Sequence, residues 1–165
     1  MDTLLGKVQV LRDEGEKERA VLLEPGTNNY KAGLGASIIN DELFKAYTKW
    51  DQAIKEISAY EKQNGVNDDT NTLKGDIEFD FGESYRSRFD IALKELKALI
   101  SAGEAEKNCG LAGAASILAF SAITHYQNSL KAYQSTGKNG KISADATFIS
   151  DVMQRWESQV KPYIG

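Results

Sequence analysis

The chain has 165 residues, enough for one domain that removes roughly 70% of its unfolded surface from water without a disulfide or metal. The content of 41% apolar residues, 27% charged residues and 2 prolines argues against a disordered chain. A balance of 20 basic and 24 acidic residues gives an acidic net charge of −4, which argues against nucleic acid as a partner. The single Cys excludes an internal disulfide, and the single His excludes any site that needs two imidazoles.

The N-terminal element, residues 1–26, allows two interpretations. Leu4, Val8 and Leu11 have helical spacing, and the charged middle of the stretch is rich in helix formers, which favours a helix. The alternative is a β-hairpin that turns at Asp13-Glu14-Gly15. Pro25-Gly26 ends the element in either case.

No targeting segment is predicted. Lys7 and Gln9 interrupt the first apolar residues, so the chain does not begin with the apolar core of a secretory signal. The longest stretch with few charges, Cys109 to Lys131, carries too many polar residues in its second half to predict a membrane span. We expect a soluble, cytoplasmic protein by default, and secretion without a cleaved signal would leave the same sequence features.

The clearest helical pattern runs from Asn40 to Asn64, and Gly65 then supplies a stop signal. Its apolar residues recur at alternating spacings of four and three, which places them on one helical face. They are Leu43, Tyr47, Trp50, Ile54 and Ile57. The same spacing continues upstream, so the helix could begin near Thr27.

A long acidic connection is predicted over residues 65–82. Within it, the segment Asp76-Ile77-Glu78-Phe79-Asp80-Phe81 alternates strictly between polar and apolar residues, which indicates a short β segment. In such a strand the three apolar side chains would cover the bundle while the three acids face water.

Three more helices are predicted, over about 83–102, over about 104–135, and from just after Ser143 to near Pro162. The middle one is apolar almost all round in its first half, which is typical of a central helix buried on several sides. Short connections favour antiparallel neighbours. We therefore predict an all-α fold, an antiparallel bundle of four to five helices in a single domain over 1–165.

Two small-residue segments resemble each other, 32–39 and 110–118. Small residues let helix backbones approach closely, and this accounts for both segments without any function. The alternative is a duplicated helix pair with a matching groove on each copy. A single match of this length falls short of the three units that a repeat architecture needs.

His125 is the only imidazole, so any Ser-His-Asp or Cys-His catalysis must use it. Cys109 lies sixteen residues earlier on the same predicted helix, roughly 24 Å away. We therefore predict structural roles for both residues and no catalytic residue. No phosphate-binding or dinucleotide-binding motif is complete, so no cofactor is predicted.

The acidic connection also has some features of a cation site. Asn67, Asp69, Asn71 and Glu78 follow a spacing that resembles an EF-hand loop, but Thr72 stands where the sharp turn requires Gly. The ligand set is incomplete, and no metal ligand is predicted. A hard-cation site would draw on Asp69, Asp76, Glu78 or Asp80.

Without enzyme motifs, we expect a non-enzymatic helical protein that acts through protein–protein interaction or self-association, as adaptors, secretion-associated proteins or inhibitors do. Its apolar stripes and seven tyrosines suit helix–helix contacts.

The alternative is a bundle that binds a small molecule or divalent cation beside the small-residue stretches Gly33–Ser37 and Gly110–Ser116. Tyr30, Tyr47, His125 and Tyr126 would supply its polar contacts. An enzyme would have to use carboxylates such as Asp80, Glu83 and Asp90.

Overall fold

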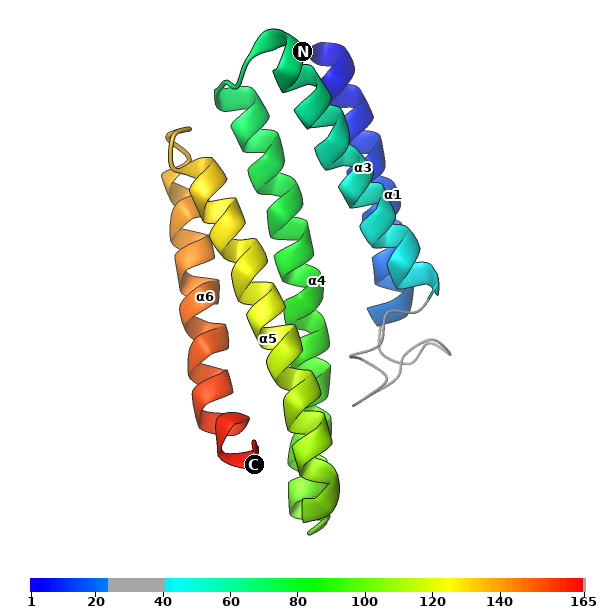
Figure 1. Cartoon of the computed structure of the whole chain (residues 1–165), viewed down its shortest axis with the longest axis vertical. Helices are drawn as coiled ribbons and strands as arrows, with labels where there is room; N and C mark the ends of the chain where they lie inside the picture. The colour runs from blue at the N-terminus through cyan, green and yellow to red at the C-terminus, as the bar shows by residue number, and fades with distance from the viewer. Residues whose placement is uncertain (24–40, 165) are drawn as a thin grey trace.

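The computed structural model describes residues 1–23 and 41–164, and within these ranges it contains five α-helices, one short 3₁₀ helix and no strand. The predicted all-α antiparallel bundle is confirmed. The helices, labelled as in Figure 1, are α1 (Asp2–Leu23), α3 (Asp41–Asn64), α4 (Asp68–Ser101), α5 (Ala105–Tyr133) and α6 (Asn139–Gln159), followed by η1 (Lys161–Tyr163).

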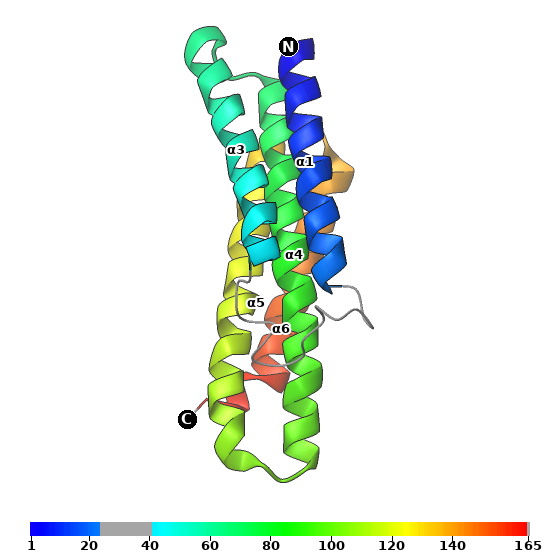
Figure 2. The same ribbon diagram turned by 90° about the vertical axis from the view of Figure 1, so that its right-hand side faces the viewer.

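The longest helix, α4, is the centre of the molecule. Figure 1 shows α5 and α6 on one side of α4 and the pair α1–α3 on the other. The contact of α4 with α5 is the most extensive in the bundle, followed by those of α1 with α3 and of α5 with α6. In Figure 2, α1 and α3 accompany only the N-terminal half of α4, and the α4–α5 hairpin continues beyond them.

Two apolar cores follow from this arrangement. The first lies between α1, α3 and the N-terminal half of α4, around the fully buried Trp50 and Ile77. The second lies between the C-terminal half of α4, α5 and α6, around Phe89 and Leu118. Tyr85 packs against both cores, so α4 joins them at about its middle.

The N-terminal element is a helix, and the hairpin alternative is wrong. Val8 is fully buried in the first core, as the helical spacing predicted. At Gly15 the Trp50 side chain of α3 packs directly on the α1 backbone, because an added Cβ would stand 2.3 Å from the Trp50 ring nitrogen. The Trp50 indole also donates a hydrogen bond to the Arg12 carbonyl oxygen at 3.3 Å, which fixes the ring against α1.

The predicted acidic connection over 65–82 is wrong, because α4 begins at Asp68 and only three residues separate it from α3. Asn67 caps the helix: its side chain accepts from the Thr70 amide at 2.9 Å, and the Thr70 hydroxyl accepts from the Asn67 amide at 3.1 Å. Such a reciprocal cap satisfies two amides that the first helical turn leaves without partners. Asp68 and Asp69 in the first turn add favourable charge at this end.

The predicted β segment over 76–81 is wrong as well, because these residues lie inside α4. Their alternation suits a helix here since α4 is covered on several sides. Ile77 and Phe81, four residues apart, enter the first core, while the Phe79 ring packs against Tyr126 on α5. The acids between them find basic or aromatic partners on neighbouring helices.

The remaining boundaries differ from the prediction only in detail. Helix α6 begins at Asn139, four residues before Ser143, whereas it was expected to begin after Ser143, and η1 extends its end to Tyr163. The antiparallel hairpins α4–α5 and α5–α6 are as predicted. The upstream extension of α3 towards Thr27 and the small-residue segment 32–39 lie outside the described residues.

Candidate functional site

The acids predicted as candidate cation ligands do not form one site. All of them are on α4, but Asp76 and Asp80 face α1, whereas Glu78 bonds to His125 on α5 with 2.6 Å between the carboxylate oxygen and Nδ1. Asp69 lies in the exposed first turn of the helix. Within 1–23 and 41–164, no group of three or more His, Cys, Asp or Glu side chains could hold a metal ion.

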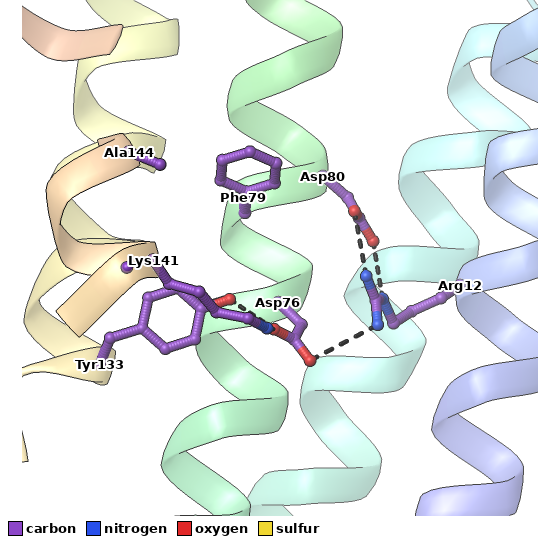
Figure 3. A pocket seen from close by; sticks show the side chains of 8 residues that line it. Arg12, Asp76, Phe79, Asp80, Tyr133, Lys141 and Ala144 are labelled. Atoms are coloured by element: carbon purple, nitrogen blue, oxygen red, sulfur yellow. Dashed lines mark hydrogen bonds and ion pairs between the residues drawn. The ribbon is translucent and has the colours of Figure 1, made fainter. Parts of the chain in front are cut away.

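A charged pocket of about 390 Å³ lies between α1 and α6, with α4 as its floor (Figure 3). Arg12 reaches in from α1 and binds Asp80 with two hydrogen bonds, of 2.8 and 3.2 Å. The same guanidinium stands 3.6 Å from Asp76, which also accepts from the Tyr133 hydroxyl and the Lys141 ammonium. Two cations thus face two carboxylates.

The pKa values in this pocket follow from burial and pairing. Burial raises the pKa of Asp80, and the hydrogen bonds and charge of Arg12 oppose that rise. Burial also raises the pKa of the Tyr133 hydroxyl, and the hydrogen bond to Asp76 adds to this effect. Since the cations and carboxylates pair with one another, the arrangement clamps α1 and α6 to α4.

One carboxylate near this pocket, that of Asp145, has fewer hydrogen-bond partners than Asp76 and Asp80. Asp145 on α6 is fully buried, and neither of its oxygens has a hydrogen bond of good geometry to any described residue. The same holds for the hydroxyl of Ser129, which is buried on α5. Burial raises the pKa of Asp145 from 3.8 to about 6, while Ser129 and the charge of Lys141 oppose the rise.

Of the polar side chains predicted for a small-ligand site, three are described, and Tyr126 lies apart from the other two. Tyr47 and His125 belong to one aromatic group, since the Tyr85 ring stacks on both rings, with 5.4 Å between ring centroids in each pair. Tyr126 turns to another side and donates to Glu83, which also pairs with Arg86 at 2.7 Å. Tyr30 and Gly33–Ser37 lie outside the described residues.

The carboxylates considered for an enzyme are also separated. Asp80 pairs with Arg12, Glu83 with Arg86, and Asp90 with Arg155, so each has its own arginine. Cys109 is exposed near the start of α5, and the same uninterrupted helix carries His125. The predicted separation of Cys109 from His125 is therefore confirmed.

An exposed face of α5 is the feature that the sequence did not indicate. This helix was expected to be buried on several sides, but Ile117 is 68% and Phe120 is 42% exposed. The two side chains are three residues apart and therefore share one helical face. Beside them lies a shallow hollow of about 430 Å³, lined by Ser116, Ile117, Phe120, Ser121, Thr124 and His125.

Two properties set this face apart. The sequence has no Asp, Glu, Lys or Arg from Cys109 to Leu130, so α5 itself contributes none of these charged side chains to the face. The Phe120 ring leans on Trp156 of α6, with 4.8 Å between ring centroids, and the Trp156 indole donates to the Ser116 hydroxyl at 2.9 Å. These contacts hold the exposed phenylalanine in place.

The glycines of this face have no packing reason within the described structure. A Cβ added to Gly110 or Gly113 would meet nothing within 4 Å. In contrast, two glycines of α4 are closely packed. An added Cβ would stand 2.4 Å from the Tyr133 ring at Gly75 and 2.8 Å from the Tyr126 ring at Gly82. Glycine destabilises a helix by about 1 kcal/mol relative to Ala, so Gly110 and Gly113 weaken α5, and no close contact in the described structure requires them.

By length and composition, the stretch Cys109–Tyr133 of α5 could cross a membrane, and half of its most apolar part is buried inside the bundle. The core helix of a soluble bundle meets the same criterion. Comparison with protein-family models, curated proteins and solved structures finds no match to this chain. The site must therefore be interpreted from its own geometry.

Proposed function

We propose that this protein is a non-enzymatic helical protein that acts by binding another polypeptide through the exposed face of α5. The observation that carries the proposal is the pair Ile117 and Phe120, both exposed on one uncharged helical face. We call this face, formed by Gly110, Gly113, Ile117, Phe120, Ser121 and Thr124, the α5 face.

On the other helices that the structure describes, the exposed apolar residues do not combine in this way. Leu5 and Val10 of α1 are five residues apart and point in different directions, and Phe44 is the one such residue described on α3. On the α5 face the two apolar side chains lie side by side with a hollow next to them. An apolar centre without charges is typical of the core of a protein–protein interface.

The glycines and the fixed ring give further support. Gly110 and Gly113 leave room for a partner backbone to come close, as small residues do at helix–helix contacts. Trp156 already fixes the Phe120 ring in the free protein, so binding costs less side-chain entropy than it would for a mobile ring.

The small-ligand alternative has weaker support. The pocket between α1 and α6 is lined by two cations and two carboxylates, but these pair with one another: Arg12 with Asp76 and Asp80, and Lys141 with Asp76. A ligand would have to break these pairs before it could form its own. The pocket is better accounted for as a clamp between helices.

The proposal is tested by photo-crosslinking in the cells from which the sequence comes. Benzoylphenylalanine replaces Phe120 in one variant and Val10, which is 55% exposed on α1, in a matched control. We expect a protein adduct from position 120 and none from position 10. Failure of position 120 to crosslink to any polypeptide, in a variant that folds normally, would refute the proposal.

A further inference from the structure

We infer that the polypeptide bound by the α5 face is a second copy of this chain, in an antiparallel contact about a two-fold axis near Ser121. The inference rests on the proposed function and names the partner. It follows from the charge, the shape and the spacing of the face.

Charge restricts where two copies can meet. Each copy carries a net charge of −4, so contact between charged surfaces of two copies is opposed by repulsion. From Cys109 to Leu130, α5 has no Asp, Glu, Lys or Arg, and His125, at the edge of the hollow, bonds through Nδ1 to Glu78. Repulsion between copies is therefore smallest if they meet here, because α5 itself brings no Asp, Glu, Lys or Arg side chain to the contact.

Shape provides the second argument. A two-fold contact brings the same patch of both copies together, so the patch must be complementary to itself. The α5 face offers both parts: Ile117 and Phe120 project, and the hollow beside them extends along α5 to Thr124 and His125. The projecting pair of one copy can enter the hollow of the other.

Spacing then fixes the register. If Phe120 of one copy lies opposite Ser121 of the other in antiparallel helices, Ile117 lies opposite Thr124, so each large apolar residue meets a small hydroxyl residue. The same register places Gly113 opposite Asn128, where the missing side chain makes room for the amide. A parallel arrangement would set Ile117 against Ile117 and leave the hollows unfilled.

A membrane surface is a less suitable occupant for this face. Helices that lie in a lipid interface carry Lys and Arg along their polar side. From Cys109 to Leu130 α5 has neither, and Ser121 and Thr124 put hydroxyls in the middle of the face. Flotation with vesicles that contain anionic lipid is therefore included in the test.

The first experiment is sedimentation equilibrium of the full chain over a range of concentrations. We expect a monomer–dimer equilibrium, and we expect Ile117→Glu/Phe120→Glu to weaken it by about 10-fold or more, because both positions are at the centre of the contact. Leu5→Glu, at a residue 49% exposed on α1, is the matched control and leaves the equilibrium unchanged. Circular dichroism verifies that each variant is folded.

Disulfide trapping tests the register, in a Cys109→Ser background. Residues 117 and 124 are two turns apart, roughly 10 Å along one helix, which is beyond the Cα separation of about 4.4–6.8 Å that a disulfide spans. Ile117→Cys/Thr124→Cys can therefore form disulfides between copies and not within one. We expect this double variant and Ser121→Cys to give covalent dimers, and Ile117→Cys alone to remain monomeric.

The outcomes separate this inference from the proposed function. A chain that stays monomeric at all concentrations overturns the inference, and an adduct at position 120 with a different protein would then leave the proposed function standing. Trapping by Ile117→Cys alone overturns the antiparallel register. Flotation with vesicles that Phe120→Glu abolishes, without dimerisation, overturns both proposals. Dimers trapped in the predicted pattern support both.

Discussion

Replacing the buried Asp145 by Asn should stabilise the protein, and more so as the pH rises. In the folded chain burial raises the pKa of Asp145 from 3.8 to about 6. The unfolded chain ionises this group at the lower value, so folding is penalised once the pH exceeds about 4, and the penalty is complete above about 6. Asn is similar in shape and carries no charge to bury.

The size of the effect follows from these two pKa values. One pKa unit corresponds to about 1.4 kcal/mol, so the full penalty is about 3 kcal/mol at pH 7.5 and falls to about 1 kcal/mol at pH 4.5. We therefore expect Asp145→Asn to raise the free energy of unfolding by about 2–3 kcal/mol at neutral pH. The advantage should shrink as the pH falls through the folded pKa.

The assay is urea unfolding followed by circular dichroism at several pH values, for the original chain and the variant. Asp151→Asn is the matched control: Asp151 is exposed on the same helix and pairs with Arg155, so its replacement should change stability by about 0.5 kcal/mol or less. Other titrating groups are common to both chains and cancel. If Asp145→Asn brings no gain in stability at neutral pH, or a gain that does not vary with pH, the reasoning is refuted.

Two further predictions concern α1. Gly15→Ala should lower the free energy of unfolding by about 1–2 kcal/mol, because the new Cβ meets the buried Trp50 ring. Gly6→Ala, with open space around it, should raise the free energy of unfolding by about 0.5–1 kcal/mol. Thermal unfolding measures both variants, and equal effects would contradict the α1–α3 contact. Arg12→Leu should destabilise by about 2 kcal/mol because it leaves Asp80 without its partner. Adding Asp80→Asn should recover most of that loss in urea unfolding, and no recovery would mean that the pair does not act as a unit.

The helices that the sequence predicts well are those with a single apolar stripe. In α3 the fully buried residues Trp50 and Ile57 lie on the stripe that alternating spacings of four and three define. Such a helix has one buried side, so its period is visible without knowledge of its neighbours.

The N-terminal half of α4 was missed because its surroundings are not visible in the sequence. The alternation over 76–81 is typical of a strand, but Arg12 and His125 supply partners for Asp80 and Glu78 from distant positions in the chain. A local signal was available in the Asn67 cap and the acidic first turn that follows it.

The exposed α5 face was missed for a related reason. A helix that is apolar all round is usually buried on several sides, and Leu111, Leu118 and Ala119 are buried as this rule predicts. Neighbouring helices cover only part of the circumference, and composition does not reveal which part remains uncovered. The uncovered part carries Ile117 and Phe120.

Cysteine protection tests most directly whether the α5 face is covered by a polypeptide. In a Cys109→Ser background, Ile117→Cys reports on the face, and Leu5→Cys on α1 reports on ordinary exposed surface. We predict that a thiol reagent labels position 117 rapidly in dilute purified protein and at least about 10-fold more slowly in the cell, while position 5 reacts alike in both. Equal labelling of position 117 in both settings would contradict the account.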